Sequence, residues 1–219
     1  MFMNDIRLNT IYNLIRDGVG VADIGTDHGY IPCNLAENGY TGNIFATDIN
    51  IGPLNKAIEN AANRGLADRI SFKLCDGIDP ALKNMVDTFV IAGMGGETIC
   101  SIMDSADDFY SDKYTFIFQP MTKAEILRYW LINNGFQIEF ETTAYDGRLY
   151  SIFTARFGGR TVLSDLELYT GKTELIADDS NYSLLLEKLE KKLEPAAHNG
   201  AILQQVLNDI RDKRMLIGS

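Results

Sequence analysis

The chain has 219 residues, 46% of them hydrophobic, and a formal net charge of −10 at pH 7. Such a length and apolar content allow one α/β domain with its own core and a smaller appendage. The negative charge argues against indiscriminate nucleic-acid binding because phosphates would be repelled. Any RNA partner would therefore need a local basic surface.

The sequence carries no signal for membrane insertion, export or metal binding. No uncharged apolar run is long enough to span a membrane, and the start, Met1 to Asp5, lacks the charged-then-apolar order of a signal peptide. The three cysteines are scattered without a CxxC pair, and the two histidines are far apart. We therefore expect a cytoplasmic protein that holds no metal.

Hydrophobic periodicity predicts alternating strands and helices over the first part of the chain. The predicted helices span 4–17, 31–38, 53–65, 97–103 and 122–133, the last opened by a capping box of Thr122 and Glu125. The predicted strands span 19–24, 43–48, 70–75, 86–92, 114–119, 136–143 and 149–157, and an Asp-Gly turn joins the last two. Alternating β/α units followed by an antiparallel hairpin are typical of the seven-stranded, Rossmann-like sheet of class I methyltransferases. Dinucleotide dehydrogenases more often keep a parallel sixth strand.

The first strand ends in a glycine turn that leads into a helix, the arrangement of a nucleotide-binding sheet. Gly25 permits close approach of the backbone to a ligand. Asp23 and Asp27 place two carboxylates where a dinucleotide site would need room for a pyrophosphate. This pattern favours a cationic ligand such as S-adenosylmethionine over a redox dinucleotide.

Acidic residues also follow the second and third strands. Asp48 lies where a carboxylate can accept both hydroxyls of an adenosine ribose, although it could instead cap the helix that starts near Gly52. Asp76 and Gly77 lie where the adenine amino group would bind, or they form an ordinary turn. The residues expected to bind the donor are Asp23, Gly25, Thr26, Asp27, Asp48, Ile49, Asp76, Gly77 and Gly93.

A glycine-rich segment, 93–96, follows the fourth strand. Such a run is entropically costly, so we expect its backbone to line the cleft as a floor for a planar base. The alternative is a flexible loop without a function.

The chain changes character after Phe157, where leucines alternate with Lys and Glu. We predict two amphipathic helices, 181–194 and 196–214, separated at Pro195 and paired in an antiparallel, coiled-coil-like manner. The chain would then divide into an S-adenosylmethionine-binding domain, 1–158, and a C-terminal helical domain, 159–219. This appendage is either a solvated helical lid or a clamp whose cations meet phosphates, namely Lys188, Lys191, Lys192, Arg211, Lys213 and Arg214.

An ordered set of motifs resembles the bacterial tRNA (adenine-22-N1)-methyltransferase family. The motifs are DIGTDHGYIP at 23–32, IAGMGG at 91–96, QP at 119–120, WLxxNGF at 130–136, DGRLY at 146–150, LSDLE at 163–167 and YTG at 169–171. The resemblance covers most of the chain. It implies a class I methyltransferase fold with a C-terminal coiled-coil-like domain, S-adenosylmethionine as methyl donor and tRNA as acceptor. Gly29 and Met121 stand where the family often has Ala and Asn.

With adenine N1 as nucleophile, alignment matters more than a base because the nitrogen has a free lone pair. The target base would be extruded from folded tRNA. Asp27 would stabilise the cationic product, Gln119 would read the adenine edge and Met94 would flank the base. His28 could donate to the cleft or be purely structural. Contacts to tRNA are expected from Arg7, Gly95, Gly96, Tyr145, Tyr150, Lys188 and Lys192.

Two other functions are compatible with the sequence. A class I methyltransferase acting on a small molecule or a protein would suit the acidic surface, although the charged tail argues against it. A catalytically silent relative that only binds RNA is opposed by the intact carboxylates Asp23, Asp27 and Asp48. We expect an active, monomeric tRNA methyltransferase.

Overall fold

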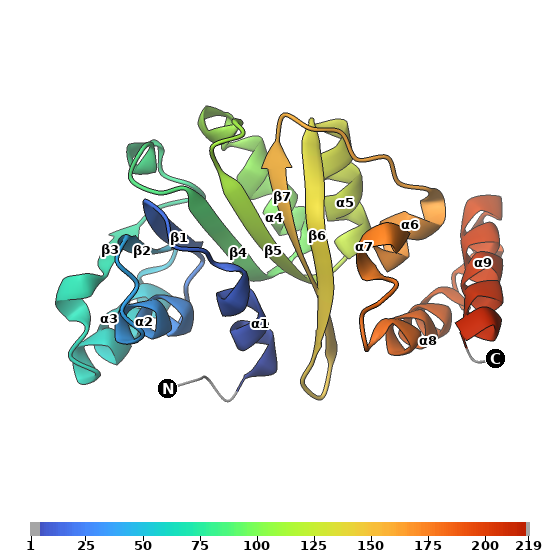
Figure 1. Cartoon of the computed structure of the whole chain (residues 1–219), viewed down its shortest axis with the longest axis horizontal. Coiled ribbons are helices and arrows are strands. Elements are labelled where there is room, and N and C mark those ends of the chain that lie inside the picture. The colour runs from blue at the N-terminus through green and yellow to red at the C-terminus, as the bar shows by residue number, and fades with distance from the viewer. Residues whose placement is uncertain (1–4, 218–219) are drawn as a thin grey trace.

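Figure 1 shows the fold as a computed structural model that describes residues 5–217. Met1 to Asn4, which include the predicted start of the first helix and most of the segment that lacks a signal-peptide pattern, lie outside the described residues. Within that range the strands are β1 (Gly20–Ile24), β2 (Asn43–Asp48), β3 (Ser71–Leu74), β4 (Thr88–Gly95), β5 (Thr115–Thr122), β6 (Phe136–Tyr145) and β7 (Leu149–Phe157).

These strands form one seven-stranded sheet in the order β3-β2-β1-β4-β5-β7-β6. β1 to β5 run parallel to one another, and β7 runs antiparallel to β5 and β6. The Asp-Gly hairpin is present, with the Asp146 N–H donating to the Arg148 carbonyl at 2.9 Å. The predicted seven-stranded, Rossmann-like sheet is confirmed.

Helices cover both faces of this sheet (Figure 1). They are α1 (Ile6–Leu14), α2 (Tyr30–Glu37), α3 (Ile51–Asn63), α4 (Gly96–Asp104), α5 (Ala124–Asn133), α6 (Asp165–Thr170), α7 (Thr173–Ile176), α8 (Tyr182–Leu193) and α9 (Ala201–Ile217). Neighbouring residues of a strand point to opposite faces. Val90 and Ile117 therefore pack under α1 and α2, while Phe89 and Phe116 pack under α4 and α5. No helix in residues 5–217 is long and apolar enough to cross a membrane.

The join between β5 and α5 differs from the prediction. Thr122 is the last residue of β5 and pairs with Gly95 of β4, so it cannot cap the helix. The residue before α5 is Lys123, which has a left-handed backbone (φ +57°) and makes no side-chain cap. The predicted capping box is therefore wrong here. A capping box does form at Ser164 and Glu167, where it opens α6.

The C-terminal helices build a core of their own. Leu186 and Leu189 of α8 pack with Val206 and Ile210 of α9, and Leu149 of β7 joins this cluster. α9 begins at Ala201 rather than 196, because a short 3-10 turn, Ala197–Asn199, intervenes. The short helices α6 and α7 were not predicted. The antiparallel, coiled-coil-like pairing of α8 and α9 stays a prediction.

A buried ion pair fastens this helical region to the sheet. Arg128 of α5 and Glu141 of β6 are almost wholly buried, and Nε of Arg128 donates to Oε1 of Glu141 at 2.7 Å. Arg128 also donates to the carbonyls of Leu168 and Tyr169, at 2.9 and 3.3 Å. The Lys172 N–H donates to the second oxygen of Glu141 at 2.5 Å. Groups from two regions of the chain thus bond to both charges, while Nη2 of Arg128 is buried without a hydrogen-bond partner in the described part of the chain.

Asp179 makes a second attachment to β6. Its carboxylate accepts hydrogen bonds from the hydroxyls of Thr142 and Thr143 and from the Thr143 N–H, at 2.7–2.8 Å. Burial raises the pKa of Asp179, but these hydrogen bonds and one from Asn181 outweigh it and hold that pKa below its usual value. The helical region is therefore fixed along β6 at two points.

Replacing Glu141 with Leu should destabilise the fold strongly. The substitution leaves the Arg128 guanidinium buried without its counter-ion, which costs about 3–5 kcal/mol of the free energy of unfolding. Urea denaturation followed by circular dichroism measures this loss. Asp108→Ala, which removes the exposed pair between Lys83 and Asp108 at 2.9 Å, is the control and should cost less than about 1 kcal/mol. Equal losses in the two variants would contradict the assignment.

Candidate functional site

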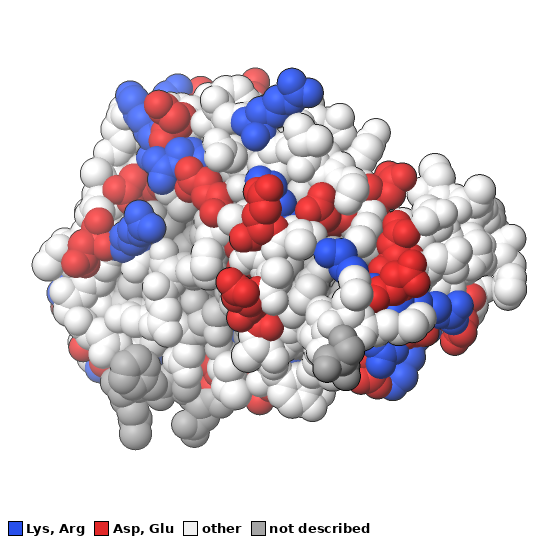
Figure 2. Space-filling model, turned by 45° about the vertical axis from the view of Figure 1, so that its right-hand side comes forward, with Lys and Arg blue, Asp and Glu red and all other residues white. Residues whose placement is uncertain are grey.

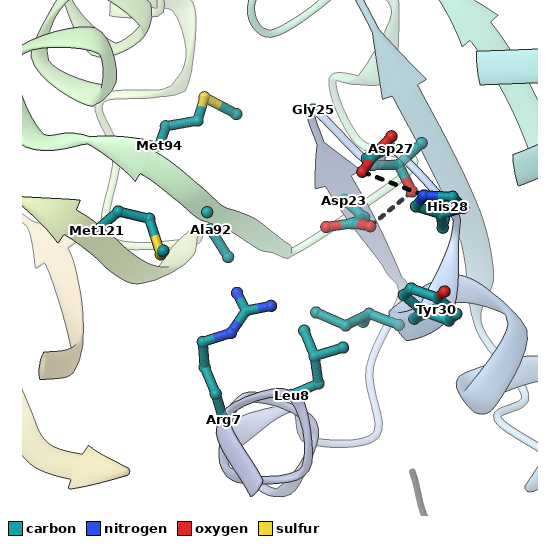
Figure 3. Close-up of a pocket in the computed structure, with 13 residues that line it drawn as sticks. Arg7, Leu8, Asp23, Gly25, Asp27, His28, Tyr30, Ala92, Met94 and Met121 are labelled. Atoms are coloured by element: carbon teal, nitrogen blue, oxygen red, sulfur yellow. Dashed lines mark hydrogen bonds and ion pairs between the residues drawn. The ribbon is translucent and has the colours of Figure 1, made fainter. Parts of the chain in front are cut away.

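A pocket of about 290 Å³ opens where β1 and β4 end. Figure 3 shows its walls, which come from α1, the turn after β1, the start of α2 and the ends of β4 and β5. Parallel strands bring their carboxyl ends to one edge of a sheet, so segments far apart in sequence meet here. The predicted site residues that line it are Arg7, Asp23, Gly25, Thr26, Asp27, His28, Gly93 and Met94.

The other predicted residues lie beside this pocket or away from it. Asp48 is buried at the end of β2, next to β1. Ile49, Asp76 and Gly77 follow β2 and β3 and do not line the pocket wall. Gly96 is explained by packing, because a methyl group on it would overlap the Lys123 carbonyl.

Three N–H groups of the glycine turn are already hydrogen-bonded within the chain. The N–H groups of Gly25 and Thr26 both donate to the carbonyl of Thr47, at 2.8 and 2.9 Å, and the Gly29 N–H donates to Thr26 at 2.9 Å. Phosphate-binding turns use free N–H groups of this kind. Gly25 itself has φ +74°, and a methyl group on it would overlap the end of Met94. The turn is therefore shaped for close approach of a ligand, and the N–H groups of Gly25, Thr26 and Gly29 are not available to a pyrophosphate.

Asp23 is the buried anion of the pocket. Its side chain is almost hidden from solvent, and one oxygen accepts a hydrogen bond from the Thr26 hydroxyl at 2.7 Å (Figure 3). Burial raises the pKa of Asp23 to about 6, although the Thr26 bond and Arg7 oppose this rise, and Asp48 adds to it. A cationic ligand would stabilise the ionised form of this carboxylate, because its positive charge compensates for the hydration that burial has removed.

Arg7 of α1 extends into the same pocket, and residues of β5 and β7 hold its side chain in position. Its Nη1 donates to Oε1 of Gln119 at 2.7 Å, and the Gly93 N–H donates to that same oxygen at 3.2 Å. Two donors on one oxygen determine which way the amide faces. The guanidinium also lies 5.6 Å from the ring centre of Tyr150. Gln119 is fully buried, so it supports Arg7 and is not part of the pocket wall.

Asp27, His28 and Tyr30 form the rim. Asp27 has an unusual left-handed backbone (φ +46°), and its side chain is 60% exposed. Its carboxylate lies 3.6 Å from Nε2 of His28, and the His28 ring stacks on Tyr30 with the ring centres 5.4 Å apart. A left-handed non-glycine residue is uncommon and often marks a functional position. Here it places a carboxylate at the mouth of the pocket.

A second groove of about 420 Å³ adjoins the pocket and shares Met121 with it. It runs between the β5–α5 join, β7 and α8, and it includes Lys188 and Lys192. Lys188 donates to the Leu149 carbonyl at 2.7 Å, and burial, followed by the repulsion of Lys192 and Arg148, lowers its pKa. Two basic residues of the predicted tail, Lys188 and Lys192, therefore line a groove that borders the pocket.

Most other cations of the predicted clamp are already paired with acids. In Figure 2, blue and red side chains lie directly beside one another on the right-hand part of the surface. Contacts within the tail, or from it to α5, account for this mixing: Lys191 with Glu187, Lys192 with Glu125, Arg211 with Glu190 and Glu194, and Arg214 with Glu190. Within the described part of the chain, no group of three or more His, Cys, Asp or Glu side chains could hold a metal ion.

Comparisons with known proteins give a family model, a curated relative and several solved structures. Residues 4–153 match a family model described as a methyltransferase domain. A tRNA (adenine(22)-N(1))-methyltransferase of Bacillus subtilis (strain 168) is 31% identical over 204 residues, which cover 91% of this chain and 84% of that protein.

Two solved structures resemble the fold over almost its whole length. One is a Streptococcus pneumoniae protein, a proposed tRNA (m1A22) methyltransferase in complex with S-adenosyl-L-methionine, with a TM-score of 0.85 and 26% identity over 97% of this chain and 100% of that one. The other is M. capricolum TrmK in complex with S-adenosyl-homocysteine, with a TM-score of 0.79 and 29% identity over 99% of each chain.

Asp23→Asn should stabilise the protein at neutral and alkaline pH. The folded chain binds the Asp23 proton more tightly than the unfolded chain, since the pKa rises from 3.8 to about 6 on folding. This carboxyl therefore lowers stability progressively as pH rises between those two values. The variant should match the wild type near about pH 4 and exceed it by about 3 kcal/mol near about pH 8.

Urea denaturation of both proteins at the two pH values measures the difference. Asp76→Asn, which changes an exposed carboxylate after β3, serves as the control and should alter stability by less than about 0.5 kcal/mol. A difference between Asp23→Asn and wild type that does not grow with pH would show that burial does not raise this pKa.

Proposed function

Because this chain belongs to the bacterial tRNA (adenine(22)-N(1))-methyltransferase family, we propose that it methylates N1 of adenine 22 in tRNA with S-adenosylmethionine as donor. The observation that carries the choice of donor is the turn after β1. The N–H groups of Gly25 and Thr26 are bonded to Thr47, and the buried carboxylate of Asp23 lies beside the turn. A cationic donor suits this arrangement, whereas the pyrophosphate of a dinucleotide would lose these two N–H contacts and meet the carboxylate.

The donor would lie across the ends of β1 and β2. Asp23, Gly25, Thr26 and Gly93 would surround its amino-acid end and its sulfonium. Asp48 would accept the ribose hydroxyls with the oxygen left free, because Oδ1 already accepts the Asn50 N–H at 2.7 Å. The cap-like role and the ribose role of Asp48 are thus compatible. Contacts of Ile49, Asp76 and Gly77 with the adenine stay predictions.

Methyl transfer to adenine N1 needs alignment and charge stabilisation from the protein. Bound S-adenosylmethionine supplies an electrophilic methyl group. Adenine N1 has a free lone pair at neutral pH, so no general base is required. The methylated base is cationic, and the carboxylate of Asp27 at the mouth of the pocket would stabilise the developing charge. Met94 would flank the base, and His28 would hold Asp27 in place through their contact at 3.6 Å.

The groove that contains Lys188 would take the tRNA strand next to the extruded adenine. It shares Met121 with the donor pocket, so a nucleotide in one would be continuous with a base in the other. Lys188, Lys192 and the exposed ring of Tyr145 are the contacts proposed. In this view residues 1–158 carry the chemistry and 159–219 complete the RNA site. We further propose that the protein acts as a cytoplasmic monomer without a metal.

Transfer of a labelled methyl group to tRNA tests the proposed function. Unmodified tRNA with adenine at position 22 should be methylated, and the same tRNA with guanine at that position should not. Equal labelling of both tRNAs would reject the proposed acceptor. Binding of S-adenosylhomocysteine without any transfer to RNA would favour a methyltransferase with another substrate or a silent RNA-binding relative.

Lys188→Met should weaken tRNA binding in a salt-dependent manner. If Lys188 neutralises one phosphate, its loss should reduce the slope of log affinity against log salt by about one. Lys191→Met is the matched control because Lys191 lies on the same helix and pairs with Glu187 at 2.5 Å. Filter binding over a range of salt concentrations gives both slopes. An unchanged slope for Lys188→Met would remove this residue from the RNA site.

A further inference from the structure

We propose that Met121 is a wedge between the extruded adenine and an adjacent base of the tRNA, and that the groove containing Lys188 receives this second base. The inference rests on the proposed function, because it takes tRNA as the acceptor. It assigns Gln119 to the support of the wedge, in place of the predicted reading of the adenine edge.

Met121 lies between two hollows of the surface. It lines the donor pocket of about 290 Å³ and also the adjoining groove of about 420 Å³. In Figure 3 it lies across the pocket from Asp23 and Asp27. Two bases joined by one phosphodiester would occupy the two hollows with the Met121 side chain between them. Proteins that unstack nucleic-acid bases insert apolar side chains, methionine among them, in this way.

The Met121 side chain is exposed but held in place. The residue is 41% exposed, and a methionine is flexible when nothing contacts it. Here Nε2 of Gln119 donates a hydrogen bond to Sδ of Met121 at 3.5 Å. The backbone on either side is paired in the sheet through Pro120 and Thr122. An apolar side chain is therefore presented on a rigid support, as insertion between two bases requires.

The hydrogen bonds of Gln119 are committed to this support. Its Oε1 accepts from Nη1 of Arg7 at 2.7 Å and from the Gly93 N–H at 3.2 Å, which uses both lone pairs. An adenine amino group would have to displace one of these donors. The Gln119 side chain is also fully buried. Gln119 is therefore a positioning residue that acts through Met121 and Arg7.

The groove suits a base better than a strand of phosphates alone. Its volume lies within the range of pockets that hold small ligands. Apolar side chains line much of it, namely Pro120, Met121, Leu149, Leu185, Leu189 and Tyr169. An unstacked base would cover these groups, whereas a phosphate would gain nothing from them. Lys188 and Lys192, on the same wall, would meet the phosphate that links this base to the adenine.

A double-mutant cycle between protein and RNA tests the wedge. The acceptors are unmodified tRNA and two versions that lack the base on the 5′ or on the 3′ side of adenine 22. On unmodified tRNA, kcat/KM of Met121→Ala should be about 10- to 100-fold below that of the wild type. On one of the two abasic tRNAs the wedge has no base to separate. The ratio of wild type to variant should therefore fall to about one on that tRNA and stay unchanged on the other.

Two further variants control for the loss of the side chain itself. Met121→Leu keeps an apolar side chain of similar volume and should stay within about threefold of the wild type on every acceptor. Met85→Ala is the matched control, because Met85 is 42% exposed and precedes β4, at the opposite edge of the sheet. It should behave as the wild type.

A fluorescence measurement reports unstacking without turnover. The tRNA carries 2-aminopurine, whose emission rises on unstacking, in place of adenine 22. With S-adenosylhomocysteine bound, saturating wild type should raise the emission severalfold. Saturating Met121→Ala should raise it much less. If Met121→Ala does not fold, Met121→Ser replaces it in both experiments with the same expected results.

Three results would overturn the proposal. One is the same ratio of wild type to Met121→Ala on all three tRNAs, which a merely structural role of Met121 predicts. Another is a loss in Met121→Leu as large as that in Met121→Ala. The third is equal emission with wild type and Met121→Ala. A wild type that methylates adenine 22 but gives any of these results contradicts the wedge alone. A wild type that methylates none of the tRNAs contradicts the proposed function.

Discussion

The burial of one carboxylate near the end of β1 governs the site. Asp23 lies where the sheet and the turn after β1 shield it from water, so its charge is costly unless a positive group is near. Within the turn, the Thr26 hydroxyl offsets part of this cost, but the N–H groups of Gly25 and Thr26 are bonded to Thr47. Arg7 provides part of the compensation from across the pocket. The rest must come from a ligand, which is why the pocket is matched to a donor with a positive charge.

The sheet and the carboxylates at its edge could be predicted because their signals are local. Apolar runs bounded by glycines locate the strands, and an aspartate at the end of a parallel strand faces the edge of the sheet whatever else surrounds it. The relation between Arg7 and Gln119 could not be predicted, since 112 residues separate them and nothing in either segment identifies the other. The end of β5 was missed for a similar reason: Thr122 has the local pattern of a cap, but Gly95 pairs with it in the sheet. The residue before α7, Lys172, bonds to Glu141, which lies far back in the chain. α6, in contrast, carries a local signal, its capping box of Ser164 and Glu167, which the prediction overlooked.

The charge distribution reconciles an acidic protein with an RNA substrate. Most basic side chains of the C-terminal helices are neutralised by acidic neighbours, as the ion pairs of Glu190 with Arg211 and Arg214 illustrate. Lys188 differs, because its contact is with the Leu149 carbonyl and not with an acid. A small number of cations beside the pocket would favour one strand of RNA at one place. Non-specific adhesion along the surface would stay weak.

The C-terminal helices are attached to the sheet through buried polar groups, so the two parts of the chain are not independent modules. Arg128 and Glu141 lie in α5 and β6, but several of their hydrogen bonds are with the backbone of 168–172. A chimaera that exchanged only the part after residue 158 would leave a guanidinium and a carboxylate inside the protein without these partners. During evolution such a tail could be acquired or lost only together with changes in the preceding strand and helix. The two parts are therefore expected to have been inherited as a single unit.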